Sequence, residues 1–250
     1  MRFLILLAAM LAPASTLAEC TVRSSDTTAA LVELYTSEGC SSCPPADRWL
    51  STFVNPLGTR RVVPLAFHVS YWDYIGWKDA YADERHTERQ RALATATGAR
   101  MVYTPQVMIA GRDFRGWTSE RAVAEAIEAV NRQPARAQIE IVSRPPAEGG
   151  AAGVASVTLR PGVKADDVAL LVAVTQNGLS SRVTAGENRG EKLSHSFAVR
   201  DFAVIRNLQG AFSFRPKPDW NLRHMSLVAF VQNLKTGEVL QALSAPLCRS

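Results

Sequence analysis

The stretch that decides the fold is residues 30–45, ALVELYTSEGCSSCPP. It opens with a continuous apolar run, residues 30–36, which predicts a buried strand. Cys40 and Cys43 follow, two residues apart, and a double proline then leads into a segment with helical spacing. Two cysteines at the start of a helix can close a small disulfide, and the helix dipole there favours a thiolate. The stretch therefore predicts a reactive dithiol.

Beyond this stretch, strand-like and helix-like segments alternate up to about residue 132. Strands separated by helices call for crossover connections and a sheet that is covered on both faces. The predicted strands are residues 62–69, 106–110 and 113–117, and the predicted helices are residues 46–54, residues 83–97, and a third that begins at Thr118 or Ser119.

After residue 134 the pattern changes to short strand-like runs that are split by Gly, Pro and Asn. No amphipathic helix intervenes, so this half predicts an all-β, sandwich-like domain. The runs are residues 139–142, 154–159, 168–174, 193–199, 212–214, 226–231 and 239–243. The chain is thus divided into a leader at 1–18, an α/β domain at 19–134 and a β-rich domain at 135–250.

The composition is that of a globular protein: 47% of the 250 residues are hydrophobic, 20% are charged, and the formal net charge is +5. A disordered chain would have fewer apolar residues and more net charge. The basic residues are spread along the chain, so no nucleic-acid partner is expected. At this length a core forms without disulfide staples, and the four cysteines need another explanation.

The first 18 residues predict a signal peptide. Arg2 gives a positive start, residues 3–12 are apolar, and small residues stand at 16 and 18. The apolar run is about half the roughly 20 residues that a membrane-spanning helix needs, so no membrane span is expected. Export, with the periplasm as the expected compartment, places the cysteines where disulfides persist.

A second feature that bears on the dithiol is Thr104-Pro105, directly before the strand predicted at 106–110. Proline at a strand start marks an edge or a special turn, and a cis bond is one option. The order of strand, CxxC, helix, strand, helix, Thr-Pro, strand pair and helix resembles the thioredoxin superfamily. The resemblance implies that Cys40 is the nucleophile, Cys43 the resolving thiol, and Pro105 a cis-proline that faces them beside Thr104.

The same resemblance suggests a role for Glu33, in the strand before the dithiol. A buried carboxylate at that place would have a raised pKa and would accept the proton of the resolving thiol. The alternative is a carboxylate that is simply paired with an arginine. The sequence departs from the thioredoxin pattern at Gly39, where tryptophan is common, and at the dipeptide Ser41-Ser42.

At finer grain, residues 32–45, 67–79 and 186–190 with His195 resemble an exported bacterial family. That family is catalogued only as a domain of unknown function with a thioredoxin-like fold, so the resemblance bears on architecture. Residues 186–190, GENRG, predict a turn between strands; the alternative is a loop that reaches the dithiol from the second domain. By alternation His195 shares a strand face with apolar residues, which favours a buried core histidine.

His68 lies near the carboxyl end of the strand predicted at 62–69, at the edge where open α/β sheets place their sites. It would either stabilise the thiolate or bind a metal with the two sulfurs; the alternative is a hydrogen-bonded histidine at a strand end. Tyr71 and Trp72 begin an aromatic-rich loop. They either line a peptide-binding groove or form a small satellite core.

The remaining cysteines, Cys20 and Cys248, lie near the two ends of the mature chain. Domain termini often lie close together, so we expect a structural Cys20–Cys248 disulfide.

The leading hypothesis is an exported thiol:disulfide oxidoreductase that acts on protein thiols or disulfides together with a redox partner, and without a cofactor. The alternatives are a copper metallochaperone that uses Cys40, Cys43 and His68, and a binding module in which the CxxC is a permanent disulfide. Neither the direction of electron flow nor the oligomeric state follows from the sequence.

Overall fold

The computed structural model describes residues 19–54, 61–145 and 150–248. The predicted signal peptide, residues 1–18, lies outside the described residues. The fold is mixed α/β and rich in strands. The described part of the chain contains three α-helices and three sheets, of eight, four and two strands.

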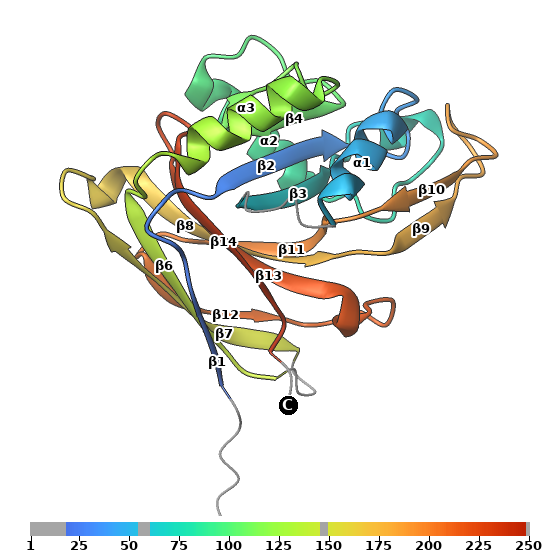
Figure 1. Cartoon of the computed structure of the whole chain (residues 1–250). Coiled ribbons are helices and arrows are strands. Elements are labelled where there is room, and N and C mark those ends of the chain that lie inside the picture. The colour runs from blue at the N-terminus through green and yellow to red at the C-terminus, as the bar shows by residue number, and fades with distance from the viewer. Residues whose placement is uncertain (1–18, 55–60, 146–149, 249–250) are drawn as a thin grey trace, which may run out of the picture.

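The large sheet joins strands from both halves of the sequence (Figure 1). Its order is β14-β13-β8-β11-β3-β2-β4-β5. β2 pairs with β3 in parallel, and β3 pairs in parallel with β11, which comes from beyond residue 134. The strands of this sheet are β2 (Ala30–Thr36), β3 (Val62–His68), β4 (Gln106–Ile109), β5 (Arg112–Asp113), β8 (Val168–Gln176), β11 (Ala198–Ile205), β13 (Met225–Asn233) and β14 (Val239–Pro246).

The four-stranded sheet combines the start of the described chain with its middle. β1 (Cys20–Arg23) pairs with β6 (Ala137–Ser143), followed in order by β7 (Ala151–Leu159) and β12 (Gln209–Phe214). The two-stranded sheet is a hairpin of β9 (Leu179–Arg182) and β10 (Lys192–His195), which extends beside the first helix (Figure 1).

Both faces of the large sheet are covered, which explains its apolar strands. On one face Leu93 of α2 (Glu84–Thr97) packs with Leu31 and Leu171. On the other face Leu50 of α1 (Pro44–Ser51) packs with Val32. That second face also carries α3 (Glu120–Asn131), and farther along it meets the four-stranded sheet.

β8 shows the consequence of this two-sided packing in one strand. All nine of its residues are buried. Leu170 and Val172 belong to the core shared with the four-stranded sheet, whereas Ala169 and Leu171 belong to the core under α2. A strand that is buried on both faces needs an unbroken apolar run, which is what residues 168–174 provide.

Two sequence-based strand assignments differ from the structure. The run at 193–199 is two strands, β10 and β11, because Phe197 between them has φ 56°. A left-handed residue interrupts the regular extended backbone of a strand. The strand predicted at 113–117 is shorter and earlier, as β5 covers only Arg112–Asp113.

Cys20 is bonded to Cys248, with a Cα–Cα distance of 5.6 Å. This is the pairing expected from the sequence. It ties β1 in the four-stranded sheet to the segment that follows β14 in the large sheet. The second disulfide joins Cys40 to Cys43.

Candidate functional site

The Cys40–Cys43 pair lies between the end of β2 and the start of α1. The backbone N–H of Cys40 donates to the carbonyl of Ser37 (3.2 Å), and that of Cys43 donates to the carbonyl of Cys40 (3.1 Å). Cys43 is the N-cap of α1, and the two prolines that follow occupy the first helical positions. Proline suits those positions because their N–H groups have no helical partner. Because Cys43 is the N-cap, the Cys40–Cys43 pair lies at the N-terminus of α1.

The disulfide is buried. Cys40 is 1% exposed and Cys43 is 0% exposed, although Ser41 and Ser42 between them are exposed. Exchange with another thiol requires a sulfur that can be approached, so burial controls the reactivity of this pair.

The cover loop, residues 183–191, connects β9 to β10 and is hydrogen-bonded to the segment around the disulfide. The side-chain amide of Asn188 donates to the carbonyls of Glu38 (2.7 Å) and Cys40 (3.0 Å). The carboxylate of Glu187 accepts from the backbone N–H of Ser41 (2.9 Å). Residues 186–190 form the turn that the sequence predicts. The same turn contacts the backbone at Cys40 and Ser41, as expected from the alternative interpretation of a loop that reaches the dithiol.

Pro105 lies at the same end of the sheet as the dithiol, because Gln106 pairs with Tyr35 near the end of β2. The Thr104–Pro105 peptide bond is cis. The indole N–H of Trp72 donates to the hydroxyl of Thr104 (2.7 Å).

Trp72 also explains the glycine that precedes the dithiol. A Cβ atom at Gly39 would lie 3.1 Å from Cβ of Trp72, so the close approach of Trp72 favours glycine there. Tyr71 and Trp72 are both half-buried and pack against the core beneath α2.

A cluster of buried histidines and carboxylates lies behind the dithiol. Nδ1 of His68 is hydrogen-bonded to Oδ2 of Asp79 (2.7 Å), and Nε2 of His195 to Oε1 of Glu38 (2.9 Å). The backbone N–H of Glu38 donates to Asp79, and the indole N–H of Trp77 donates to the second oxygen of Glu38. The two histidines thus belong to one hydrogen-bonded network, and their rings meet edge to face with centroids 4.7 Å apart.

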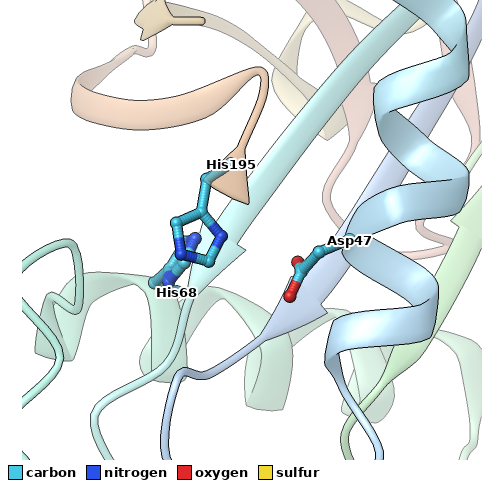
Figure 2. A group of neighbouring side chains, drawn as sticks. All are labelled: Asp47, His68 and His195. Carbon is cyan, nitrogen blue, oxygen red and sulfur yellow. The ribbon is translucent and has the colours of Figure 1, made fainter. Parts of the chain in front are cut away.

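Asp47 completes this cluster from α1 (Figure 2). It lies four residues after Cys43, one turn along the same helix face. The Thr36 hydroxyl donates to Oδ2 of Asp47 (3.2 Å). Burial raises the pKa of Asp47 above its usual value, against the opposing effect of His195 and His68.

The charges in the cluster shift each other's protonation. Burial lowers the pKa of the His68 imidazole, but the carboxylates of Asp79, Asp47 and Glu38 outweigh it and raise the pKa to about 9. Burial raises the pKa of Asp79, but His68 outweighs it and holds that pKa below its usual value. Each member of the His68–Asp79 pair therefore stabilises the charged form of the other.

Glu33 lies on the opposite face of β2 from α1. Its carboxylate accepts from Arg89 of α2 (2.6 Å) and from the hydroxyl of Tyr35 (3.2 Å). The arginine-paired alternative describes this position, and the proton-acceptor role beside Cys43 does not fit it. The carboxylate that does lie on the dithiol side is Asp47.

The residues that could hold a metal together, within the described ranges, are Asp47, His68 and His195. The copper interpretation combined His68 with the two sulfurs, but in this structure the sulfurs are bonded to each other. A cavity of about 600 Å³ lies elsewhere, between α2 and strands β8, β11 and β13.

Sequence reasoning missed Asp47 and Glu38, and it offered a contact by the loop that carries Asn188 only as the alternative to a simple turn. The four-residue spacing from Cys43 is a signal that could have found Asp47, because it predicts a shared helix face. Asn188 reaches Cys40 across a sequence separation of 148, for which no local pattern exists.

Comparison with known proteins gives a family and a fold. A family model described as "Protein of unknown function (DUF1223)" matches residues 31–232. A crystal structure of an Agrobacterium tumefaciens protein is 24% identical, with a TM-score of 0.64 over 91% of this chain and 98% of that chain. HBP35 of Porphyromonas gingivalis is 14% identical, with a TM-score of 0.65 over 90% of this chain and 76% of that chain. No curated protein matches.

Proposed function

The chain belongs to the family described as proteins of unknown function (DUF1223), and for this member we propose the activity of an exported thiol:disulfide oxidoreductase. The observation that carries the proposal is the Cys40–Cys43 pair at the N-terminus of α1, at the same sheet end as the cis-proline Pro105. A helix N-terminus favours the thiolate form of a cysteine, which is the form that exchanges disulfides.

We assign the α/β part, residues 19–134, to a thioredoxin-like arrangement. Supporting this are the element order β2, CxxC, α1, β3, α2, cis-proline, β4, β5, α3 and the neighbouring strands β3-β2-β4-β5. The β-rich part, residues 135–250, supplies the cover loop, so its proposed role is to control access to the dithiol.

The reaction proceeds in two exchange steps. In the reduced enzyme the Cys40 thiolate attacks a substrate disulfide, a mixed disulfide forms, and one substrate thiolate leaves. The Cys43 thiolate then attacks the Cys40 sulfur, so the Cys40–Cys43 bond forms and the second substrate thiolate leaves. Two electrons pass to the substrate, whose thiolates take protons from water, and the reverse sequence oxidises a substrate dithiol.

Both sulfurs are buried and the cover loop is hydrogen-bonded to Cys40 and Ser41, so substrate approach would proceed through movement of that loop. We assign Thr104, Tyr71 and Trp72, which are partly exposed near Pro105, to binding the substrate peptide. The hydrogen bond from Trp72 to Thr104 links these groups at the same sheet end.

Two disulfides fit an oxidising compartment, in line with export to the periplasm. No described helix is long and apolar enough to cross a membrane. The partners of this activity would be protein thiols or disulfides and a second redox protein that resets the dithiol.

The test is exchange with a glutathione buffer. Wild-type protein should oxidise or reduce its Cys40–Cys43 pair as the buffer potential changes, and should transfer the disulfide to a reduced peptide. Cys40→Ser should abolish transfer, whereas the matched double variant Cys20→Ser/Cys248→Ser should retain it. Equal transfer by wild type and Cys40→Ser would overturn the proposal.

A further inference from the structure

The redox proposal makes no use of the two buried histidines behind the dithiol. His68 comes from the end of β3, His195 from β10 and Asp47 from α1, so three separate elements converge (Figure 2). His68 is 0% exposed, His195 2% and Asp47 6%. Burying ionisable groups is unfavourable unless they are paired or bind a metal, so this convergence needs a physical reason.

Each histidine is held by a buried carboxylate through one ring nitrogen and keeps the other nitrogen free. Asp79 binds Nδ1 of His68, and Glu38 binds Nε2 of His195. Nε2 of His68 and Nδ1 of His195 are buried and have no hydrogen-bond partner in the described structure. A carboxylate that fixes one nitrogen and leaves the other as a ligand is the usual outer shell of a metal-bound histidine.

The distances suit a single ion. One nitrogen of each histidine and one carboxylate oxygen of Asp47 all lie within 4.8 Å of one another. Ligand atoms around a tetrahedral Zn²⁺ at about 2.1 Å lie roughly 3.4 Å apart, so modest side-chain rotations would bring the three atoms to bonding distance. The Tyr81 ring packs edge-on against both imidazoles, with centroid distances of 5.3 Å, and limits how they turn.

The charges favour a cation. Asp47, Asp79 and Glu38 bring three carboxylates into one buried cluster. With neutral imidazoles a dication would compensate most of this charge, and imidazole nitrogen selects transition metals over Mg²⁺ or Ca²⁺. Protonation of both imidazoles is the competing way to balance the negative charge. A metal titration distinguishes protonation from metal binding.

We propose that Asp47, His68 and His195 bind one divalent transition-metal ion, with Zn²⁺ as the probe. The inference goes beyond the redox activity and does not depend on it, since neither sulfur is a ligand.

The test is a Zn²⁺ titration of chelator-treated, oxidised full-length protein by calorimetry, with Co²⁺ absorption as a second readout. We expect one ion per chain and a visible Co²⁺ spectrum typical of nitrogen and oxygen ligands. His195→Gln and Asp47→Asn should each lose at least about tenfold in affinity, the scale on which even outer-shell changes act. The exposed His224 provides the matched control, His224→Gln, which should bind as wild type.

Folding is checked by thermal unfolding of each metal-free variant, and Asp47→Asn retains the shape of the side chain if a histidine variant fails to fold. Cys40→Ser/Cys43→Ser should keep the site, which separates it from thiolate binding and from failure of the redox proposal. No binding by well-folded wild type would show that protons balance the cluster. Binding that survives both His195→Gln and Asp47→Asn, or that disappears with the two cysteines, would also overturn the inference.

Discussion

Asn188→Ala should release the cover loop and accelerate reduction of the Cys40–Cys43 disulfide. The wild-type amide donates two hydrogen bonds, to the carbonyls of Glu38 and Cys40, and Asn188 is 6% exposed. A neutral hydrogen bond contributes about 1 kcal/mol net, so loss of both removes about 2 kcal/mol of closing free energy. This corresponds to a roughly 30-fold larger population of open molecules.

If reduction proceeds through the open form, its rate should rise by the same factor of about 30. The assay is reduction by dithiothreitol without denaturant, stopped by alkylation at successive times, with mass mapping of both disulfides. The Cys20–Cys248 bond serves as the internal reference, because it joins β1 to the segment after β14. Arg189→Ala is the matched control, since that side chain lies on the same loop and is exposed.

Only the Cys40–Cys43 bond should be reduced faster in Asn188→Ala. If both disulfides accelerate together, reduction follows global unfolding and the cover loop does not control access. If neither accelerates, the two hydrogen bonds do not hold the loop closed. Either result would refute the reasoning.

Three further predictions concern the same architecture. Cys20→Ser/Cys248→Ser should lower the free energy of unfolding in urea by up to about 5 kcal/mol, because a loop of 228 residues is no longer closed in the unfolded chain; an unchanged midpoint would contradict this. Glu33→Gln should lower the free energy of unfolding by about 3–5 kcal/mol, because it leaves the buried Arg89 without its carboxylate partner. The folded variant should exchange disulfides as fast as wild type; slower exchange would restore Glu33 as the proton acceptor. Glu187→Gln should be reduced faster than wild type at pH 7 by a phosphine. Hydrogen bonds from Ser41 hold the pKa of Glu187 below its usual value. The contact between Glu187 and Ser41 is therefore fully present above the ordinary glutamate pKa and is lost as the pH falls through the lowered pKa. The two rates should therefore converge in acid, and a difference that does not depend on pH would contradict the assignment.

The local pattern predicted individual elements well. Residues 30–36 form β2 as expected, and α2 begins at Glu84 with Asp83 as its cap. Those elements depend on apolar periodicity and capping, which are local properties. Phe197 shows the limit, because a single residue with φ 56° divides an apolar run into two strands and no periodicity signals it.

The arrangement of the sheets was harder to predict because it depends on contacts distant in sequence. The parallel pairing of Ala198 with Ala66 places a strand from beyond residue 134 next to β3. The predicted division of the chain at residue 134 relied on a change in the local sequence pattern. The pairing of strands depends instead on which apolar faces can be buried together.

The pairing of the cysteines was predicted from the sequence, whereas the buried groups around the Cys40–Cys43 pair were missed. CxxC spacing and terminal position were enough to pair all four cysteines. The carboxylates of Asp47, Glu38 and Asp79 are ordinary acids in the sequence, and they become a site only because three elements bring them to two histidines. Tertiary structure, and not spacing, creates that chemistry.

The measurement that tests the central claim most directly is the reduction potential of the Cys40–Cys43 pair. Protein is equilibrated in graded thiol–disulfide buffers, quenched by alkylation, and the oxidised fraction of that pair is read by mass. A pair that exchanges disulfides should have a midpoint above about −300 mV, within reach of exchange partners. A pair that remains oxidised well below that potential would be a permanent structural disulfide, and the proposed oxidoreductase activity would be wrong.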